Sequence, residues 1–195
     1  AWARVEGLQP DTDYDWSIEI GGAPAGHGRL RTWAGKASRL AFLVIGDYGD
    51  ASKAQYALAN VMAELVTRRA AGPDPIRFVL TTGDNIYGKG FGFLRFGSGS
   101  DDSGWWPPFF QPYAAILRRI PFYPTLGNHD GNETEVRADL PAYLGNFFFP
   151  GGEPRRYYHF QYAGLADFFA LDSTSITAAG PPRPAFLPDG TQSAW

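Results

Sequence analysis

The chain has 195 residues, of which 44% are hydrophobic, and a formal net charge of −3 at pH 7. This length suits one medium domain, or one domain with a piece of another, and the apolar content is sufficient for a hydrophobic core. The absence of cysteine excludes disulfides and thiolate metal sites, and the slightly acidic balance lacks the basic excess typical of nucleic-acid binding. No apolar run approaches the roughly 18 residues that span a membrane, so we expect no transmembrane segment.

The first part of the chain predicts an antiparallel β-hairpin. Large apolar and polar residues alternate over residues 14–20 and again over 28–33, and a glycine-rich turn at 21–26 separates the two stretches. The pattern Leu-x-Pro-x-Thr-x-Tyr at residues 8–14 resembles the corner before the penultimate strand of fibronectin type III domains, where a tyrosine hydroxyl bonds back to the chain. An isolated hairpin is the alternative interpretation.

The fibronectin resemblance implies a domain boundary. It assigns residues 1–35 to the C-terminal strands of a fibronectin type III-like module, followed by a short linker and a second domain over residues 39–195. Because the chain begins without methionine and in the middle of a pattern, we expect the earlier strands of this module to lie outside the sequence.

The second domain opens with a strand–helix–strand unit. Residues 40–45 and 76–81 are apolar and strand-like, and apolar residues at helical spacing predict a helix over 52–71 between them. Such a βαβ unit places its two strands parallel in one sheet. A third strand-like stretch follows at 122–126.

The later segments predict shorter elements. Helices are expected at 112–119 and at 135–144, the second interrupted by a proline, and two strands at 157–162 and 166–172. Residues 88–104 form a long loop rich in glycine, serine and aspartate, and loops of this length are commonly functional. The whole pattern predicts a mixed α/β (α+β) fold.

Each of the three early strands ends in a short polar cluster. The clusters are Gly-Asp-Tyr-Gly at 46–49, Gly-Asp-Asn-Ile-Tyr at 83–87 and Gly-Asn-His-Asp at 127–130. Because parallel strands of an open α/β sheet end at one edge, we expect the three clusters to form a single site. Taken singly, an acidic or amide residue after glycine is also a common helix cap or turn residue, so their joint occurrence carries the prediction.

The side chains in these clusters suit a metal centre. Asp47, Asp84, Tyr87 and Asn128 offer carboxylate, phenolate and amide oxygens, which hard or borderline metal ions prefer. A two-metal hydrolase needs a group that bridges ions about 3.5–4 Å apart, and the carboxylate of Asp84 is the candidate. His129 can donate a hydrogen bond to a phosphoryl oxygen or protonate a leaving alkoxide. The pattern predicts a metal-dependent phosphoester hydrolase.

In order and spacing, the three clusters resemble the calcineurin-like metallophosphoesterase superfamily, and Tyr87 in the second cluster resembles its purple acid phosphatase branch. The resemblance implies a β-sandwich flanked by helices and a dinuclear centre of Fe(3+) with Fe(2+), Zn(2+) or Mn(2+). It assigns Asp47, Asp84 and Tyr87 to the ferric ion. It also assigns Asp84 and Asn128 to the second ion, and His129 to the substrate phosphate. A trivalent ion accounts for a tyrosinate ligand, because its charge overcomes a phenol pKa near 10.

The sequence departs from that family pattern in its histidines. Two further blocks of the family supply three metal-binding histidines, whereas this chain has three histidines in all, His27, His129 and His159. His27 lies in the hairpin, and His159 alternates within a strand, where we expect a surface or packed side chain rather than a ligand. We therefore expect a chain truncated at both ends that binds metals weakly and has little or no activity alone.

The resemblance favours one function among three. It implies hydrolysis of small phosphate monoesters, as in acid phosphatases, by the intact protein. A phosphodiesterase or nucleotidase with the same metals is the nearest alternative, and a non-catalytic binding or adhesion protein with a degenerate phosphatase fold is another. The resemblance also implies a secreted or periplasmic protein. The sequence predicts neither the second metal nor the oligomeric state.

Overall fold

A computed structural model of the chain describes residues 3–87, 90–91, 94–95, 102–127, 129–130, 141–152 and 156–172. Its elements in chain order are β1 (Asp13–Ile20), β2 (Ala23–Arg31), β3 (Ala41–Ile45), α1 (Lys53–Arg69), β4 (Ile76–Thr81), β5 (Gly90–Phe91), β6 (Leu94–Arg95), a 3-10 helix (Asp102–Trp105), a π-helix (Trp106–Phe110), α2 (Gln111–Leu117), β7 (Phe122–Tyr123), α3 (Pro141–Asn146), β8 (Tyr158–Tyr162) and β9 (Ala166–Ala170). The fold is mixed α/β, as the sequence predicts. None of the helices in the described ranges has the length and apolarity to cross a bilayer.

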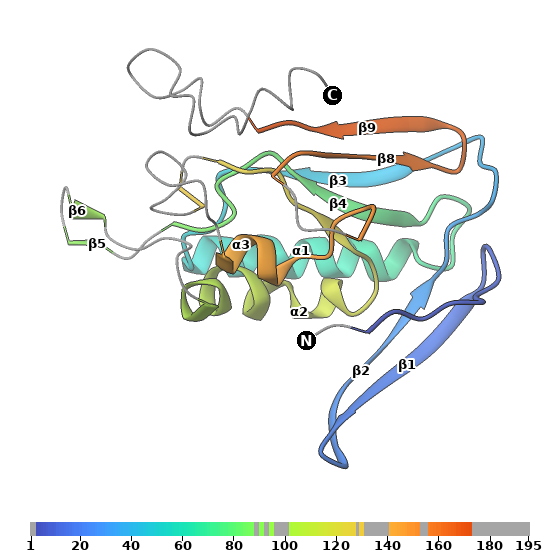
Figure 1. Ribbon diagram of the computed structural model, residues 1–195, viewed down its shortest axis with the longest axis horizontal. Helices are drawn as coiled ribbons and strands as arrows, with labels where there is room; N and C mark the ends of the chain where they lie inside the picture. Colours follow the sequence, from blue (N-terminus) through green and yellow to red (C-terminus); the bar gives the residue numbers. More distant parts are fainter. Residues whose placement is uncertain are drawn as a thin grey trace.

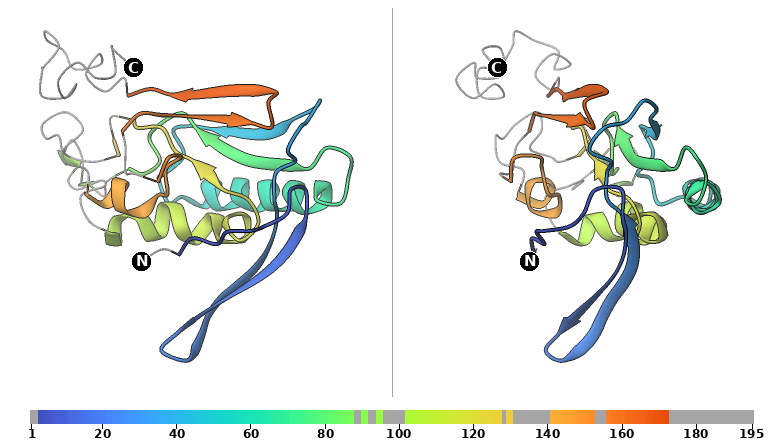
Figure 2. Two further views of the ribbon diagram at one scale, coloured as in Figure 1. Left: turned by 45° about the vertical axis from the view of Figure 1, so that its right-hand side comes forward. Right: turned by 90° about the vertical axis from the view of Figure 1, so that its right-hand side faces the viewer.

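The elements form layers. A parallel sheet in the order β3-β4-β7 lies in the middle, with helices α1 and α2 on one side and the β8–β9 hairpin on the other (Figures 1 and 2). Both neighbouring pairs in this sheet are parallel, which confirms the arrangement expected from the strand–helix–strand unit. The carboxyl ends of all three strands therefore lie at the same edge.

Helix α1 begins at a cap that the sequence encodes. The Ser52 hydroxyl accepts a hydrogen bond from the Gln55 N–H at 3.1 Å. The Gln55 side chain in turn accepts one from the Ala51 N–H at 2.7 Å, a variant of the Ser-x-x-Gln capping box. The same side chain donates to the Pro108 carbonyl oxygen in the π-helix, so the cap also ties α1 to the neighbouring helical segment.

An aromatic core joins the layers. Phe78 on β4 is completely buried, and rings from the hairpin β8–β9, the neighbouring strands and the chain before β3 surround it. The ring centroids of these neighbours lie within 5.3–6.1 Å of the Phe78 ring: Trp33, Phe42, Tyr123, Phe160, Tyr162 and Phe168. Burial of large aromatic side chains dominates core energetics, so this cluster holds the hairpin against the sheet.

The N-terminal hairpin extends away from the layered domain (Figure 1). Strands β1 and β2 pair antiparallel, as expected, but the turn is shorter than the sequence suggests. Gly21 and Gly22, with φ of 58° and 80°, make the whole turn, and β2 starts at the next residue. A two-residue turn with both φ positive matches the twist of a hairpin, which explains why the following glycines pair as strand.

The structure describes helix α3 over Pro141–Asn146, which overlaps the helix expected at 135–144. The rest of that helix lies outside the described residues, and so does most of the loop expected at 88–104. The third strand is shorter than predicted, because only Phe122 and Tyr123 pair with β4.

Candidate metal centre

The first two polar clusters and the described part of the third meet at the carboxyl edge of the parallel sheet. The Asp47 N–H donates to the Gly83 carbonyl oxygen at 3.2 Å, and the Tyr87 N–H donates to the Gly49 carbonyl oxygen at 2.7 Å. These bonds join the loop after β3 to the loop after β4. The sequence prediction that the strand ends form one site is consistent with this geometry.

Three predicted ligands converge on one point. The Tyr87 hydroxyl lies 3.1 Å from Asp47 Oδ1 and 3.0 Å from Asp84 Oδ2. Asp84 is 8% exposed, whereas Asp47 lies at the surface, so the cluster opens to solvent on the Asp47 side. A phenol carries one proton and can donate only one hydrogen bond at a time. Two carboxylates and one phenol oxygen therefore share a position where a cation would satisfy all three better than a single proton does.

The charges at this position fit a metal ion. Neither Asp47 nor Asp84 forms an ion pair with an Arg, Lys or His side chain of the described residues. A buried carboxylate without a cationic partner is costly, and metal coordination is one of the usual ways to compensate it. Within the described part of the chain, no three Asp, Glu or His side chains gather closely enough to hold an ion by themselves. The candidate site therefore depends on Tyr87 as its third oxygen donor.

The environment of Tyr87 keeps it protonated in the absence of a cation. Burial, followed by the hydrogen bond to Asp84, raises the pKa of Tyr87 above its ordinary value. Negative neighbours disfavour a phenolate, so only a strongly charged ion at the same position would produce one. The donor set thus fits a highly charged, oxygen-preferring metal ion.

The backbone at both aspartates is unusual. Asp47 and Asp84 have φ of 54° and 50°, in the left-handed region that side chains other than glycine rarely adopt. Non-glycine residues in this region cost free energy and persist where the surrounding structure over-determines them, often at functional sites. Each of these two aspartates is the second residue of its cluster, so the same strained turn projects both carboxylates from their strand ends.

Glycines allow the loops to approach closely. A methyl group added at Gly127 would collide with the backbone nitrogen and carboxylate of Asp84, and one added at Gly46 would collide with the Thr82 hydroxyl. The glycines that precede the acidic or amide residues are therefore explained by close packing. Because glycine has no side chain, the backbones of the three clusters can approach one another closely.

His129 lies beside the three oxygens. Its backbone N–H donates to Asp84 Oδ1 at 3.0 Å, and its ring centroid is 4.8 Å from the Tyr87 ring. The residue is partly exposed to solvent. Asn128, the fourth predicted ligand, lies outside the described residues. His159 faces away from the core on β8 and contacts Asp167 and the Phe169 ring, in line with the expectation that it is a surface residue.

A buried carboxylate that the sequence analysis left without a role organises the site. Asp130 is completely buried, and its carboxylate accepts hydrogen bonds from the Gly127 N–H at 2.7 Å and from the Ile86 N–H at 3.2 Å. The Asn85 amide also donates to it at 2.8 Å. The bonds from Ile86 and Asn85 join the loop after β7 to the loop after β4, and the bond from Gly127 fixes the Asp130 side chain within its own loop. Burial raises the pKa of Asp130 to about 7, although the Gly127 and Asn85 donors oppose the shift.

Asn85 extends this network to the first cluster. Its side chain donates to the Thr125 carbonyl oxygen at 2.9 Å and accepts from the Tyr48 hydroxyl at 2.8 Å. All three clusters thus meet in one buried polar network beneath the candidate ligands. The signal was present in the sequence, because Tyr48, Asn85 and Asp130 are the remaining polar members of the three clusters, but only their burial shows their role.

Comparisons with known proteins identify the family. The family model for calcineurin-like phosphoesterases matches residues 40–182. Purple acid phosphatases 4 and 3 of Arabidopsis thaliana are 33% and 36% identical to the chain over 106 residues, which cover 54% of this chain and 26% of each relative. The chain therefore spans about a quarter of the length of these curated relatives.

Two solved structures share the fold. PhoD has a TM-score of 0.52 at 17% identity, over 84% of this chain and 37% of its own. The purple acid phosphatase PPD1 from yellow lupin (Lupinus luteus) seeds has a TM-score of 0.52 at 15% identity, over 80% of this chain and 29% of its own. Since the family model spans most of the chain and covers all three clusters, the protein belongs to the calcineurin-like phosphoesterase family.

Proposed function

We propose that the intact protein hydrolyses phosphate monoesters at a dinuclear metal centre, as an acid phosphatase of the purple type. One observation carries this proposal: the Tyr87 hydroxyl lies 3.1 Å from a carboxylate oxygen of Asp47 and 3.0 Å from one of Asp84. The purple acid phosphatases of Arabidopsis thaliana among the relatives support the branch.

The proposed roles come from the family resemblance, and the positions of Asp47, Asp84 and Tyr87 support them. Asp47, Asp84 and Tyr87 would hold a ferric ion, and Asp84 with Asn128 would hold Fe(2+), Zn(2+) or Mn(2+). The bound ions would supply Lewis-acid activation of the phosphate and of a water molecule. His129 binds a phosphoryl oxygen and holds a proton for the leaving oxygen, since its ring lies beside Tyr87 and reaches solvent.

The proposal extends to the parts of the molecule that surround the site. We propose that three histidines of a longer chain complete the centre, in a β-sandwich flanked by helices. We also propose that residues 1–35 form part of a fibronectin type III-like module, which is joined to a catalytic domain over residues 39–195. The Gln9 N–H, which donates to the Tyr14 hydroxyl at 2.9 Å, supports that module, because it is the corner bond that the sequence motif predicts. A secreted or periplasmic location is part of the same proposal.

The test uses the longer protein, loaded with iron and zinc. A tyrosinate bound to a ferric ion absorbs visible light by charge transfer, so the proposal predicts a visible band that Tyr87→Phe abolishes. Tyr14→Phe, in the hairpin, is the matched control and should keep the band. Hydrolysis of an aryl phosphate monoester should exceed that of the corresponding diester.

Two results would contradict the proposal in different ways. An iron-loaded protein without a visible band, or a band that survives Tyr87→Phe, removes the purple-type centre. Faster hydrolysis of the diester than of the monoester assigns the same metals to a phosphodiesterase. If neither ester is hydrolysed by a protein that binds both metals, the binding-protein alternative holds.

A further inference from the structure

A cavity of about 70 Å³ lies between the N-terminal hairpin and the layered domain, beside the start of β4 and so at the opposite end of the parallel sheet from the polar clusters. Four arginines and one aspartate supply its charged walls: Asp13, Arg29, Arg31, Arg77 and Arg119. Its remaining walls come from β2, the end of α1, the start of β4 and the chain after α2. Since roughly 10–15 Å³ of such space suffices for one water molecule, the cavity has room for one small tetrahedral ion.

The arginine on β4 is the most informative wall residue. The Arg77 side chain is 12% exposed, yet in the described part of the chain only one bond satisfies it, a 3.2 Å contact from its Nη2 to Asp11 Oδ1. A guanidinium has five N–H donors, and a nearly buried one normally has most of them satisfied. Asp11 is itself shared, because Arg31 binds both of its carboxylate oxygens at 2.9 and 3.0 Å. Arg77 therefore retains donors that the described residues do not use.

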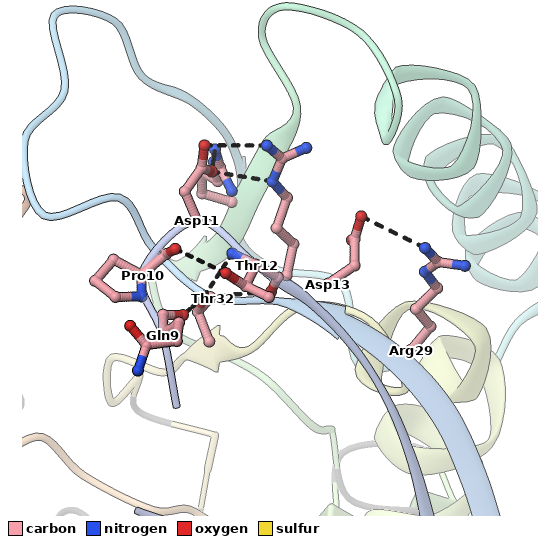
Figure 3. Close-up of polar contacts among 9 residues, drawn as sticks. Gln9, Pro10, Asp11, Thr12, Asp13, Arg29 and Thr32 are labelled. Atoms are coloured by element: carbon pink, nitrogen blue, oxygen red, sulfur yellow. Dashed lines mark hydrogen bonds and ion pairs between the residues drawn. The ribbon is translucent and has the colours of Figure 1, made fainter. Parts of the chain in front are cut away.

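The charges around the cavity do not cancel. Asp11 pairs with both Arg31 and Arg77, and Asp13 pairs with Arg29 at 3.4 Å (Figure 3). Arg119 forms no ion pair or side-chain hydrogen bond with the described residues. Four guanidinium groups thus face two carboxylates. The C-terminal ends of α1 and α2 also lie nearby, and they offset at most about one positive charge together.

We propose that this cavity binds inorganic phosphate as a dianion, at a site separate from the metal centre. Planar guanidinium groups match the oxygens of phosphate, and several of them converge here on a space of the right size. The hairpin supplies Arg29 and Arg31, whereas the layered domain supplies Arg77 and Arg119. A bound phosphate would therefore tie the hairpin to the domain. This inference does not depend on the proposed catalytic activity.

The test is calorimetric titration of the metal-free chain, in EDTA, with inorganic phosphate. Removing metals keeps the polar clusters from contributing to the signal. We expect saturable binding of one phosphate that weakens as sodium chloride is added, because the attraction is electrostatic. Arg119→Gln should weaken binding at least tenfold. Arg118→Gln, which removes the neighbouring exposed arginine outside the cavity, is the matched control and should bind as the parent does.

A second variant tests the sign of the charge effect. Asp13→Asn removes the one carboxylate in the cavity wall, so it should bind phosphate more tightly, a change that a damaged fold would not produce. Glycerol 3-phosphate should bind more weakly than inorganic phosphate, since esterification removes one of the terminal oxygens that the guanidinium groups can bind. Absence of saturable binding, equal binding by Arg119→Gln, weaker binding by Asp13→Asn or tighter binding of the ester would each overturn the proposal.

Discussion

The two ends of the parallel sheet are built in opposite ways. At the carboxyl edge, the candidate metal centre rests on a buried network in which Asp130 and Asn85 are fully enclosed and bonds from Asn85 and Ile86 to Asp130 cross between loops. At the other end, the hairpin meets the domain through the Arg77–Asp11 ion pair and a hydrogen bond from the Trp16 indole to the Arg118 carbonyl oxygen, each at 3.2 Å. The buried network fixes side-chain positions at the candidate site, whereas the contacts at the other end attach the hairpin to the domain.

The two ends of the sheet should differ in their sensitivity to substitution. A buried acceptor that is removed leaves its donors unsatisfied at their full desolvation cost, whereas an exposed pair that is broken is replaced by water. We therefore expect substitutions beneath the metal centre to cost much more than substitutions at the hairpin junction. The following experiments measure that contrast, from the largest effect to the smallest.

Asp84→Asn should have the largest effect, on activity. It keeps the shape of the side chain but removes the charge that the proposed bridging ligand needs, so phosphatase kcat/KM of the longer, metal-loaded protein should fall at least about 100-fold. Metal content, measured by elemental analysis, should fall with it. Asp167→Asn, on the exposed face of β9, is the control and should retain both. Equal activity in the two variants would refute the bridging role.

Asp130→Ala should have the largest effect on stability. It leaves the Gly127 and Ile86 N–H groups and the Asn85 amide without their acceptor, which should lower the free energy of unfolding by about 3 kcal/mol or more. Urea denaturation measures the change. Asp15→Ala is the control, because Asp15 is exposed on β1 and has no side-chain partner among the described residues. If Asp130→Ala lowers the free energy of unfolding by less than about 1 kcal/mol, the hydrogen bonds of Asp130 do not stabilise the fold as proposed.

Gly127→Ala tests the close approach of the loops. The added methyl group meets the Asp84 backbone and carboxylate, so we expect a loss of about 1–3 kcal/mol together with weaker metal binding. Gly145→Ala is the matched control in helix α3, where nothing lies within 4 Å of the added carbon and alanine is the better helix former. Thermal unfolding should separate the two variants in opposite directions. A stabilised Gly127→Ala would contradict the packing.

Trp16→Phe probes the hairpin junction. It keeps an aromatic ring but removes the N–H that donates to the Arg118 carbonyl oxygen, so the cost should be about 1 kcal/mol. Urea denaturation combined with limited proteolysis of the hairpin measures it. A cost as large as that of Asp130→Ala would erase the contrast between the two ends of the sheet.

Asp11→Asn should show the smallest effect, and one that depends on pH. Hydrogen bonds from Arg31 hold the pKa of the Asp11 carboxyl below its ordinary value. The stabilisation is therefore present above the unfolded-state pKa of about 3.9 and is lost as pH falls through the lower folded-state pKa. Because the pair is exposed, we expect less than about 1 kcal/mol between neutral and acidic pH, absent in the variant. Identical pH profiles of stability would show that the pair contributes nothing.

Much of the fold could be predicted from local sequence. The Ser-x-x-Gln cap, the apolar strands and the alternating hairpins each encode their element within a few residues, and the strand–helix–strand order predicts the parallel pairing. The buried face of α1 was less predictable. Leu58 and Val61 follow the helical spacing but are 45% and 61% exposed, whereas the polar Gln55 is buried because it reaches Pro108. Which face a helix buries depends on what packs against it.

The residues of the candidate site could likewise be predicted only in part. Asp47, Asp84, Tyr87 and His129 could be chosen from the sequence, because chemistry restricts which side chains suit metals and phosphate and strand order places them at one edge. Asp130 and Asn85 could not be given a role, since a polar residue in a loop acquires one only when burial removes water and leaves specific partners. The arginine cavity was equally invisible, because its walls come from residues far apart in the chain.

The elements, their order and the chemical types of the candidate ligands can be predicted from the sequence, since these depend on local periodicity, turn chemistry and side-chain identity. Three further features come from tertiary contacts: two carboxylates and a phenol share one position, Asp130 lies beneath them, and four arginines surround a cavity at the hairpin junction. The physical reason is that distance, burial and unbalanced charge belong to contacts between distant segments, and no local pattern encodes them.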